Sequence, residues 1–214
     1  MLLVATYELG HQPGNLARPA AALLARGHDV RALDTSVDPW DPALAAWADL
    51  VAFSVPMHTA SRLARELVPT VDTPTCCYGL YAHVCADVAD RVISGEYDDA
   101  LVAWVESPTH GSSRELGSAA PAPTPALPAR SLLPALDRYT MLSDRGQMRV
   151  VGSVDTTRGC AHRCRHCPVP VVYDARVRLA NERAVLDDIA QLVESGATHV
   201  TFGDPDFLNA PLHA

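Results

Sequence analysis

Three cysteines lie close together in residues 157–168, at Cys160, Cys164 and Cys167, with the spacing C-x3-C-x2-C. Three nearby sulfurs on one loop can wrap a compact cluster without distant ligands. A cuboidal cluster has four irons, so three thiolates leave one iron open to bind a small molecule. The spacing therefore predicts a 4Fe-4S cluster that binds a substrate or cofactor.

Two other kinds of site remain open at this loop. One is a zinc site completed by His162 or His166, and the other is a redox pair formed by Cys164 and Cys167. Haem attachment is excluded, because Pro168 and not histidine follows the last cysteine.

The elements that would position this loop read as one βαβ unit. We predict a strand at 149–155, a loop through the cysteines, a helix at 182–195 and a strand at 199–203. Asn181 is placed to cap the start of this helix, and Gly196 to end it. Its predicted apolar face consists of Leu186, Ile189, Ala190 and Val193. We expect an incomplete barrel here, because a single βαβ unit leaves a parallel sheet open after two strands.

The first hundred residues alternate short apolar runs with helical patterns, which is typical of a parallel sheet covered by helices. The predicted strands are 2–6, 29–33, 50–54, 75–78 and 91–93, and the predicted helices are 16–26, 59–67 and 97–105. This pattern predicts an α/β, doubly wound (Rossmann-like) domain whose ligand crevice lies at the carboxyl ends of the strands.

A stretch rich in Ser, Pro, Ala and Gly follows, at 107–131, and we expect it to be a surface linker. The chain then divides into a doubly wound domain at 1–106, a linker and connecting segment at 107–148, and the barrel segment at 149–214.

The cysteine motif after a predicted strand resembles that of the radical S-adenosylmethionine superfamily, over about residues 151–209. In that family the C-x3-C-x2-C loop follows the first strand of a partial (β/α) barrel. The resemblance implies a 4Fe-4S cluster and S-adenosylmethionine as cofactors. It also implies reductive cleavage to a 5′-deoxyadenosyl radical, with an external electron donor of flavodoxin or ferredoxin type. The family usually has an aromatic residue before the last cysteine. Here that position is His166, whose planar imidazole we expect to stack near the adenine.

Family members also carry a Gly-Gly-Glu-like segment at the end of the second barrel strand, which binds the methionine amino group. Residues 201–207 read Thr-Phe-Gly-Asp-Pro-Asp-Phe, so the resemblance assigns this role to Gly203, Asp204 and Asp206. The alternative is a strand that simply ends in an Asp-Pro turn.

The order of a doubly wound domain, a linker and the cysteine loop resembles the cobalamin-binding subclass of the same superfamily. Residues 77–82 and 92–97 resemble its glycine turn after the fourth strand and its Gly-Glu after the fifth. Residues 134–139 and 164–173 resemble the subset of radical proteins named for a CUAEP or CCAEP tail.

Free-standing cobalamin domains use the motif D-x-H-x-x-G, in which histidine ligates cobalt and aspartate orients it. His11 and Gly14 match this motif, whereas Leu9 replaces the aspartate. Ser54 and Gly79 sit at predicted strand ends and are candidates for contact with the nucleotide tail. Each of these residues also has an ordinary interpretation as a loop or turn residue.

The composition limits the classes of molecule that the chain is expected to bind. The chain has 17 basic and 25 acidic residues, a net charge of −8, so we expect a small-molecule or peptide substrate and no nucleic acid. No run approaches the ~20 apolar residues that span a bilayer, so we expect a cytoplasmic protein without membrane contact. We expect Cys76, Cys77 and Cys85 to be core residues.

Two rival hypotheses stand beside the radical enzyme. One is a non-catalytic fragment that binds zinc or a cofactor. The other is a tRNA-modifying methylthiotransferase, which would need further cluster cysteines in its first domain and a basic RNA-binding module. For an incomplete barrel we expect weak binding of S-adenosylmethionine and little 5′-deoxyadenosine from this chain alone.

Overall fold

A computed structural model describes residues 1–115 and 127–207. Six strands form a parallel sheet in the order β2-β1-β3-β4-β5-β6. They are β1 (Leu2–Ala5), β2 (Arg31–Asp34), β3 (Val51–Ser54), β4 (Thr75–Tyr78), β5 (Arg91–Gly95) and β6 (Gly111–Glu115). The five strands predicted from the sequence are confirmed, each within two residues at its ends.

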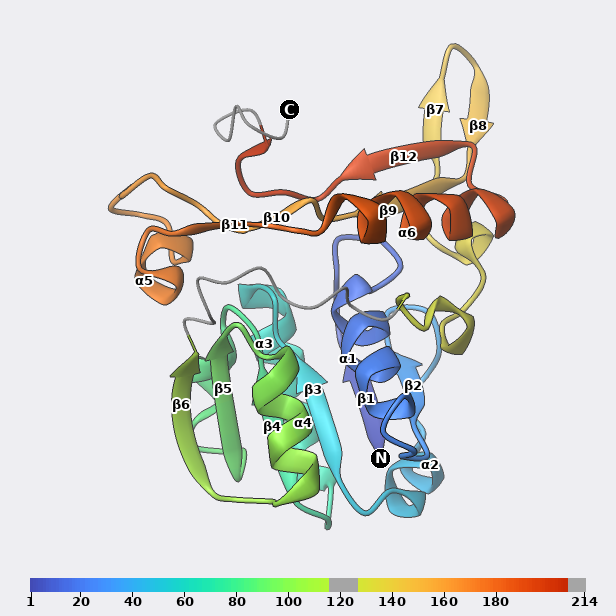
Figure 1. The fold of residues 1–214 in the computed structure, drawn as a ribbon. Coiled ribbons are helices and arrows are strands. Elements are labelled where there is room, and N and C mark those ends of the chain that lie inside the picture. The colour runs from blue at the N-terminus through green and yellow to red at the C-terminus, as the bar shows by residue number, and fades with distance from the viewer. Residues whose placement is uncertain (116–126, 208–214) are drawn as a thin grey trace.

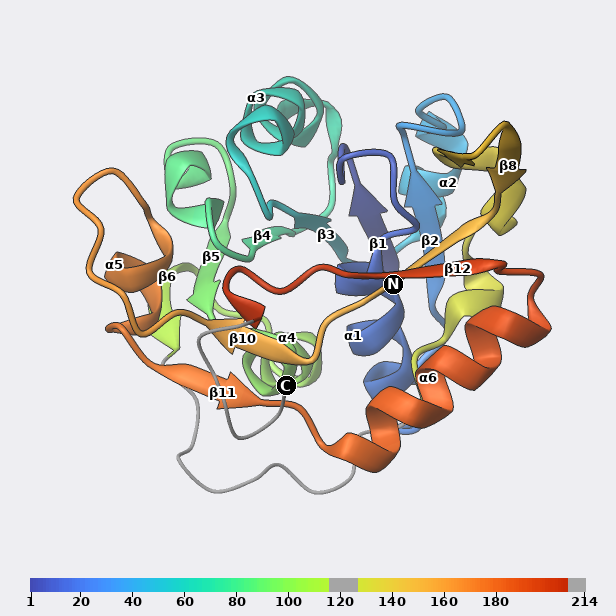
Figure 2. The ribbon, with the colours of Figure 1, turned by 90° about the horizontal axis from the view of Figure 1, so that it is seen from above.

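Both faces of this sheet are buried, because helices cover each of them (Figures 1 and 2). In β1, Leu3 and Ala5 point into one core and Leu2 and Val4 into the other, as the alternation of side chains along a strand requires. The helices are α1 (Gly14–Leu24) and α4 (Asp98–Glu106) on the first face, α2 (Pro42–Trp47) and α3 (His58–Leu67) on the second.

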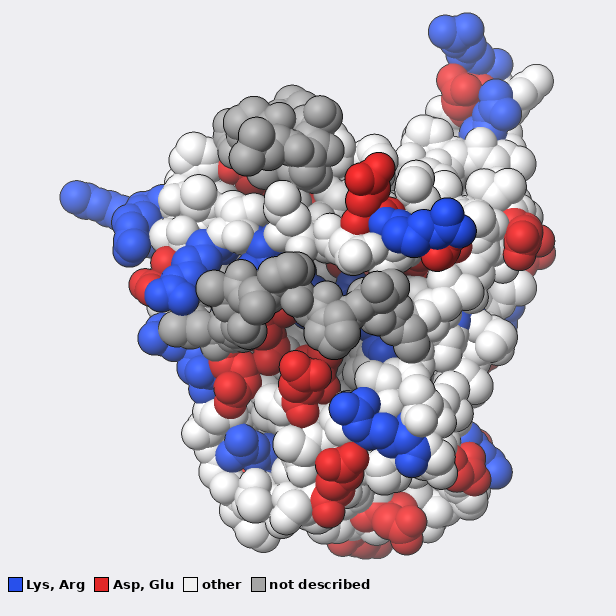
Figure 3. Space-filling view, in the orientation of Figure 1, with Lys and Arg blue, Asp and Glu red and all other residues white. Residues whose placement is uncertain are grey.

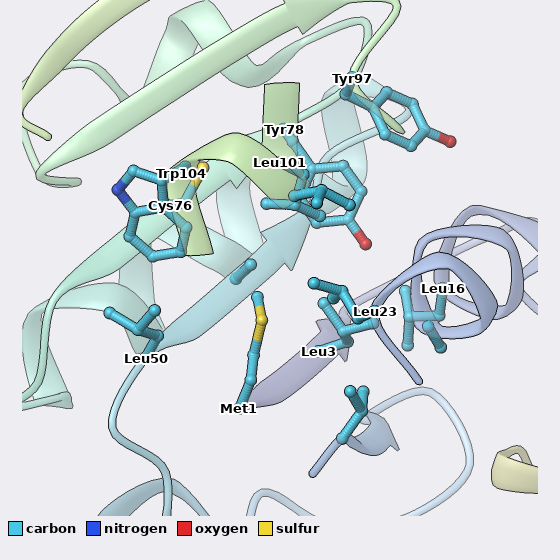
Figure 4. Close-up of a cluster of buried hydrophobic side chains, with 14 of the residues drawn as sticks. Met1, Leu3, Leu16, Leu23, Leu50, Cys76, Tyr78, Tyr97, Leu101 and Trp104 are labelled. Carbon is cyan, nitrogen blue, oxygen red and sulfur yellow. The ribbon is translucent and has the colours of Figure 1, made fainter. Parts of the chain in front are cut away.

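Figure 4 shows the first of these cores, a cluster that includes Leu16 and Leu23 of α1, Leu101 and Trp104 of α4, and Leu3 of β1. The three predicted helices are confirmed as α1, α3 and α4. The prediction missed α2, although its signal is present in the sequence. Asp41 precedes Pro42, and its carboxylate accepts hydrogen bonds from two amides of the first turn.

Cys76, Cys77 and Cys85 are fully buried in these two cores, so their predicted role as small core residues is confirmed. No helix in the described residues is long and apolar enough to cross a membrane.

The predicted linker at 107–131 is wrong for the five residues of β6, which pair in parallel with β5. An edge strand is held by backbone hydrogen bonds and exposes most of its side chains, so its composition does not reveal it. Further along, Arg130–Leu132 forms a short 3-10 turn, and Leu133 packs into the first core. Residues 116–126 of the predicted linker lie outside the described residues.

The carboxy-terminal elements form a layer across the carboxyl ends of the six-stranded sheet (Figures 1 and 2). Its strands are β7 (Leu142–Asp144) and β8 (Gln147–Arg149), which form a hairpin, β9 (Val151–Val154), β10 (Thr157–Gly159), β11 (Val177–Leu179) and β12 (His199–Phe202). Its helices are α5 (Val169–Tyr173) and α6 (Glu182–Glu194). β9 and β12 pair in parallel, and α6 lies between them along the chain, which confirms the predicted βαβ unit.

The orientation of α6 corrects the predicted apolar face. Leu186 and Val193 are 53% and 56% exposed, whereas Leu192 is fully buried and Asp188 is 6% exposed. The buried stripe runs through Val185, Asp188, Ile189 and Leu192, the i, i+3, i+4, i+7 pattern with an acidic residue inside it. Periodicity of apolar residues placed the face wrongly because it assigns every aspartate to solvent.

The ends of α6 agree with the sequence. The Asn181 side chain accepts a hydrogen bond of 3.1 Å from the amide of Ala184, so the predicted cap is confirmed. Gly196 has φ +98°, a conformation that ends the helix at little steric cost.

Candidate cofactor site

A cavity of about 500 Å³ lies between the six-stranded sheet and the carboxy-terminal layer. On the sheet side its lining includes His11, Ser54 and Gly79, and on the other side it includes Gly203 and Asp204. In a doubly wound sheet ligands bind at the carboxyl strand ends, next to the point where the strand order reverses. Here that point lies between β1 and β3. Five of the residues predicted for cobalamin and for S-adenosylmethionine therefore line one cavity.

Glycines line this cavity on both sides. Gly79 has φ +111°, and a Cβ there would lie 3.1 Å from the carbonyl oxygen of Val55. At Gly203 a Cβ would collide with the Asp155 carboxylate. Neither position accepts a side chain without movement of its neighbour, so both residues line the cavity with backbone alone.

An ion pair joins the two halves of the protein across this cavity. Arg18 of α1 donates a 3.1 Å hydrogen bond to Asp155, which follows β9. The same guanidinium donates 2.9 Å hydrogen bonds to Asn15 and to the Tyr97 hydroxyl. Burial, the largest influence, raises the pKa of Tyr97 well above its usual value, so this phenol stays protonated as a hydrogen-bond donor.

Glu8, in the loop after β1, also lines the cavity. Its Oε1 accepts a 2.6 Å hydrogen bond from Asn15, and its Oε2 is buried with no hydrogen-bond partner among the described residues. Burial, with the nearby Asp155 carboxylate, raises the pKa of Glu8 to about 8, although Arg18 works in the opposite direction. Glu8 therefore holds a proton near neutral pH. Sequence reasoning missed it, and its signal was an acidic residue just past a buried strand.

A second set of ion pairs joins the residues just before the cysteine loop to the first domain. Arg158 donates to Glu96 at 2.9 Å and to Asp98 at 2.6 Å. Burial would raise the pKa of Asp98, but the guanidiniums of Arg158 and Arg18 outweigh it and hold this pKa below its usual value. Arg158 stands two residues before the first cysteine, so this pair anchors the start of the loop to the first domain.

The cysteine loop itself begins with β10, which pairs antiparallel with β11. Gly159 has φ +77°, and a Cβ there would collide with the Arg176 carbonyl oxygen, so only glycine fits where the chain turns toward the cysteines. Cys164 is exposed, whereas Cys160 and Cys167 are half-buried.

The three thiols do not converge on one point. Within 1–115 and 127–207, no three His, Cys, Asp or Glu side chains gather closely enough to hold a single metal ion. A cuboidal cluster differs from a single ion in this respect, because each thiolate binds a different iron. The donor set of three thiols on one loop therefore suits a cluster in its chemistry.

The acidic residues predicted to bind the methionine group have separate places. Asp204 lines the cavity, but its carboxylate also accepts hydrogen bonds from the Thr156 amide at 3.1 Å, the Thr156 hydroxyl at 2.8 Å and the Thr157 hydroxyl. Asp206 lies beside the cysteine loop instead, 3.0 Å from His162 and 3.5 Å from the sulfur of Cys160.

Burial and the Asp206 carboxylate raise the pKa of Cys160. His166 is exposed on the loop, and the described lining of the cavity includes neither His166 nor Asp206.

Comparisons with known proteins fit this architecture. No protein-family model matches the chain, and no curated protein matches its sequence. Two solved structures of TsrM from Kitasatospora setae, a radical S-adenosylmethionine methyltransferase, match its fold at 18% identity. One has cobalamin and a 4Fe-4S cluster bound, with a TM-score of 0.68; the other has a tryptophan substrate and the analogue aza-SAM, with a TM-score of 0.66.

The match covers 99% of this chain and 48% and 49% of those chains, so this chain spans about half of their length. The predicted fold class is confirmed: an α/β chain with a doubly wound parallel sheet followed by a βαβ unit. Over nearly its whole length, the chain shares its fold with a radical S-adenosylmethionine methyltransferase that binds cobalamin.

Proposed function

We propose that this chain binds a 4Fe-4S cluster through Cys160, Cys164 and Cys167 and uses it with S-adenosylmethionine and cobalamin. The single observation that carries the proposal is the shared cavity. It brings the residues predicted for cobalamin and for S-adenosylmethionine to one space, with the cysteine loop leaving it at Gly159. The solved structures of similar fold, which hold cobalamin and a 4Fe-4S cluster in one case and an analogue of S-adenosylmethionine in the other, support it.

Each wall of the cavity would contact one cofactor. His11, Ser54 and Gly79 would contact cobalamin at the strand ends, and Gly203 and Asp204 would contact the methionine portion of S-adenosylmethionine. When bound, the cluster and S-adenosylmethionine supply reductive cleavage of the sulfonium to methionine and a 5′-deoxyadenosyl radical.

The protein's own residues position these groups. Arg18 and Asp155 tie the two walls together, and Asp204 holds Thr156 and Thr157 at the start of the cysteine loop. Glu8 presents a protonated carboxyl to the cavity, where it can donate a hydrogen bond to a ligand.

A second candidate function is methyl transfer. It is favoured by the fold shared with a methyltransferase and by the single cavity, since a methyl donor and cobalamin must meet for a methyl group to pass between them. The substrate of either reaction would be a small molecule or a peptide. A finer assignment, to the subset named for a CUAEP or CCAEP tail, is supported by residues 134–139 and 164–173.

Anaerobic reconstitution with iron and sulfide tests the proposal. We expect about four irons per chain and a broad absorbance in the blue-violet. Equilibrium binding of S-adenosylmethionine and of cobalamin is then measured, followed by assays for 5′-deoxyadenosine and for methylcobalamin, which separate the two candidate reactions. One tightly bound zinc and no iron would instead establish the non-catalytic metal-binding alternative.

A further inference from the structure

The basic residues of this chain are unevenly distributed. All 17 are arginines, and five of them lie within residues 158–178, where Asp174 is the single acidic residue. This segment therefore carries a formal charge of 5 − 1 = +4 in a chain whose net charge is −8. The positive segment contains the cysteine loop.

The fold brings four exposed arginines around helix α5. Arg163 and Arg165 lie in the turn before it, and Arg176 follows its carboxyl end. Arg114 of β6 reaches the same helix and donates a 3.0 Å hydrogen bond to the carbonyl of Val171. Figure 3 shows blue atoms gathered at the left edge, over the loop and helix labelled α5 in Figure 1. We call these four residues the arginine rim.

Three of the four arginines in the rim differ from most other arginines of the chain in their pairing. Within the described residues Arg114, Arg163 and Arg165 form no ion pair, and Arg176 pairs with its neighbour Asp174 at 3.4 Å. Arg18, Arg130 and Arg158 each hold a carboxylate. Guanidiniums without a carboxylate are available to acidic groups from outside the chain.

An apolar side chain is exposed beside the arginine rim, because Val171 of α5 is 68% exposed and its carbonyl accepts the hydrogen bond from Arg114. An apolar side chain beside charged ones fits the arrangement of protein–protein interfaces, an apolar core within a polar rim. Cys164 is exposed beside it, so a cluster held by this loop would lie near the surface.

We propose that the arginine rim is the docking surface for a small acidic electron-carrier protein that delivers electrons to the cluster at Cys164. This inference rests on the proposed function, since it gives the cluster its reductant. The carrier, a reduced flavoprotein of the flavodoxin class, loses one electron and the cluster gains one, and no bond forms or breaks. Val171 favours a protein over a nucleic acid, because a phosphate backbone offers nothing to match an exposed valine.

The test is the binding of an acidic flavodoxin to the full chain, measured by fluorescence anisotropy at low and at high salt. We expect salt-sensitive binding that weakens about tenfold or more in Arg163→Glu/Arg165→Glu and in Arg114→Glu. The matched control is Arg145→Glu, an exposed arginine on the β7–β8 turn across the molecule from α5, which should bind like the wild type. Arg114 lies outside the cysteine loop, so its variant separates docking from any damage to that loop.

Equal binding by all variants would overturn the proposal. So would the opposite partner preference, in which a single-stranded RNA binds in an arginine-dependent way and flavodoxin does not. Docking is measured without the cluster, so the iron content of the same preparations judges the proposed function separately. Arginine-dependent flavodoxin binding to a chain that takes up no iron would leave the surface established and refute the cluster.

Discussion

Arg130 and Asp188 face each other in the interior through two parallel hydrogen bonds, of 2.6 and 2.7 Å, with side chains only 4% and 8% exposed. The same guanidinium donates to Gln12 at 3.0 Å and to the carbonyl of Ser153 at 2.9 Å. Arg130 thus links the loop after β1, the strand β9 and the helix α6 in one buried network. This pair sets the rotation of α6 about its axis. It also sets the position of the cavity wall that the carboxy-terminal layer forms.

The first prediction concerns this pair. Arg130→Ala or Asp188→Ala leaves a buried charge without its partner, so each should lower the free energy of unfolding by about 3–5 kcal/mol. Urea denaturation measures this, with Arg183→Ala as the control on the exposed side of α6, where the ion pair with Asp187 is worth about 0.3–0.5 kcal/mol. If Arg130→Ala and Asp188→Ala lowered the free energy of unfolding no more than the control, the network would not be buried in solution.

The second prediction concerns iron. Alanine at Cys160, Cys164 or Cys167 should abolish the iron content and the blue-violet absorbance of the reconstituted protein, because each of these thiolates holds one of the three protein-ligated irons. Alanine at Cys76 should leave the iron unchanged, since that thiol is buried in the first core. Full iron in any one of the first three variants would remove that cysteine from the ligand set.

The third prediction concerns pH. The pKa of Glu8 is about 8 in the folded chain and 4.5 in its ordinary state, so the folded chain binds the extra proton between these values. The stability linked to Glu8 is fully present below pH 4.5 and is lost as the pH rises through 8. Glu8→Gln keeps the size of the side chain and the hydrogen bond with Asn15 but never ionises. Its urea midpoint should exceed that of the wild type above pH 8 and match it below pH 4.5; equal midpoints throughout would mean that Glu8 ionises normally.

The fourth prediction concerns cobalamin. Because Leu9 stands where an orienting aspartate would be, His11→Ala should change cobalamin affinity little. Leu9 also has φ +53°, a conformation that aspartate adopts more readily than leucine, so Leu9→Asp should fold normally. We expect Leu9→Asp to raise the affinity about tenfold, and the added His11→Ala to remove that gain. A large loss of affinity from His11→Ala in the wild type would show that the imidazole ligates cobalt without a carboxylate.

The fifth prediction concerns Asp204. Removing its carboxylate frees the Thr156 amide and the hydroxyls of Thr156 and Thr157 at the base of the cysteine loop. Asp204→Ala should therefore lower both the retention of iron during gel filtration and the affinity for S-adenosylmethionine, whereas Asp187→Ala on the exposed face of α6 should change neither. Loss of S-adenosylmethionine binding with full iron retention would show that Asp204 contacts S-adenosylmethionine but does not support the cysteine loop.

Local features were predictable from the sequence because they depend on neighbouring residues. The strands of the first sheet follow from apolar runs, the start of α6 from Asn181, and its end from Gly196. The cysteine spacing likewise predicts a cluster loop without reference to the rest of the chain. The residues at the carboxyl strand ends were predictable as cavity residues because a parallel sheet brings those ends to one edge.

What the tertiary structure decided is the pairing of residues far apart in the chain. Asp188 reads as a surface residue, and it is buried because Arg130, 58 positions earlier, meets it. Arg18 and Asp155 are 137 positions apart, and their ion pair exists only because the carboxy-terminal layer lies across the sheet. A charge enters the interior only when a partner of opposite charge offsets its desolvation, and that partner is determined by packing, which the pattern of nearby residues does not contain.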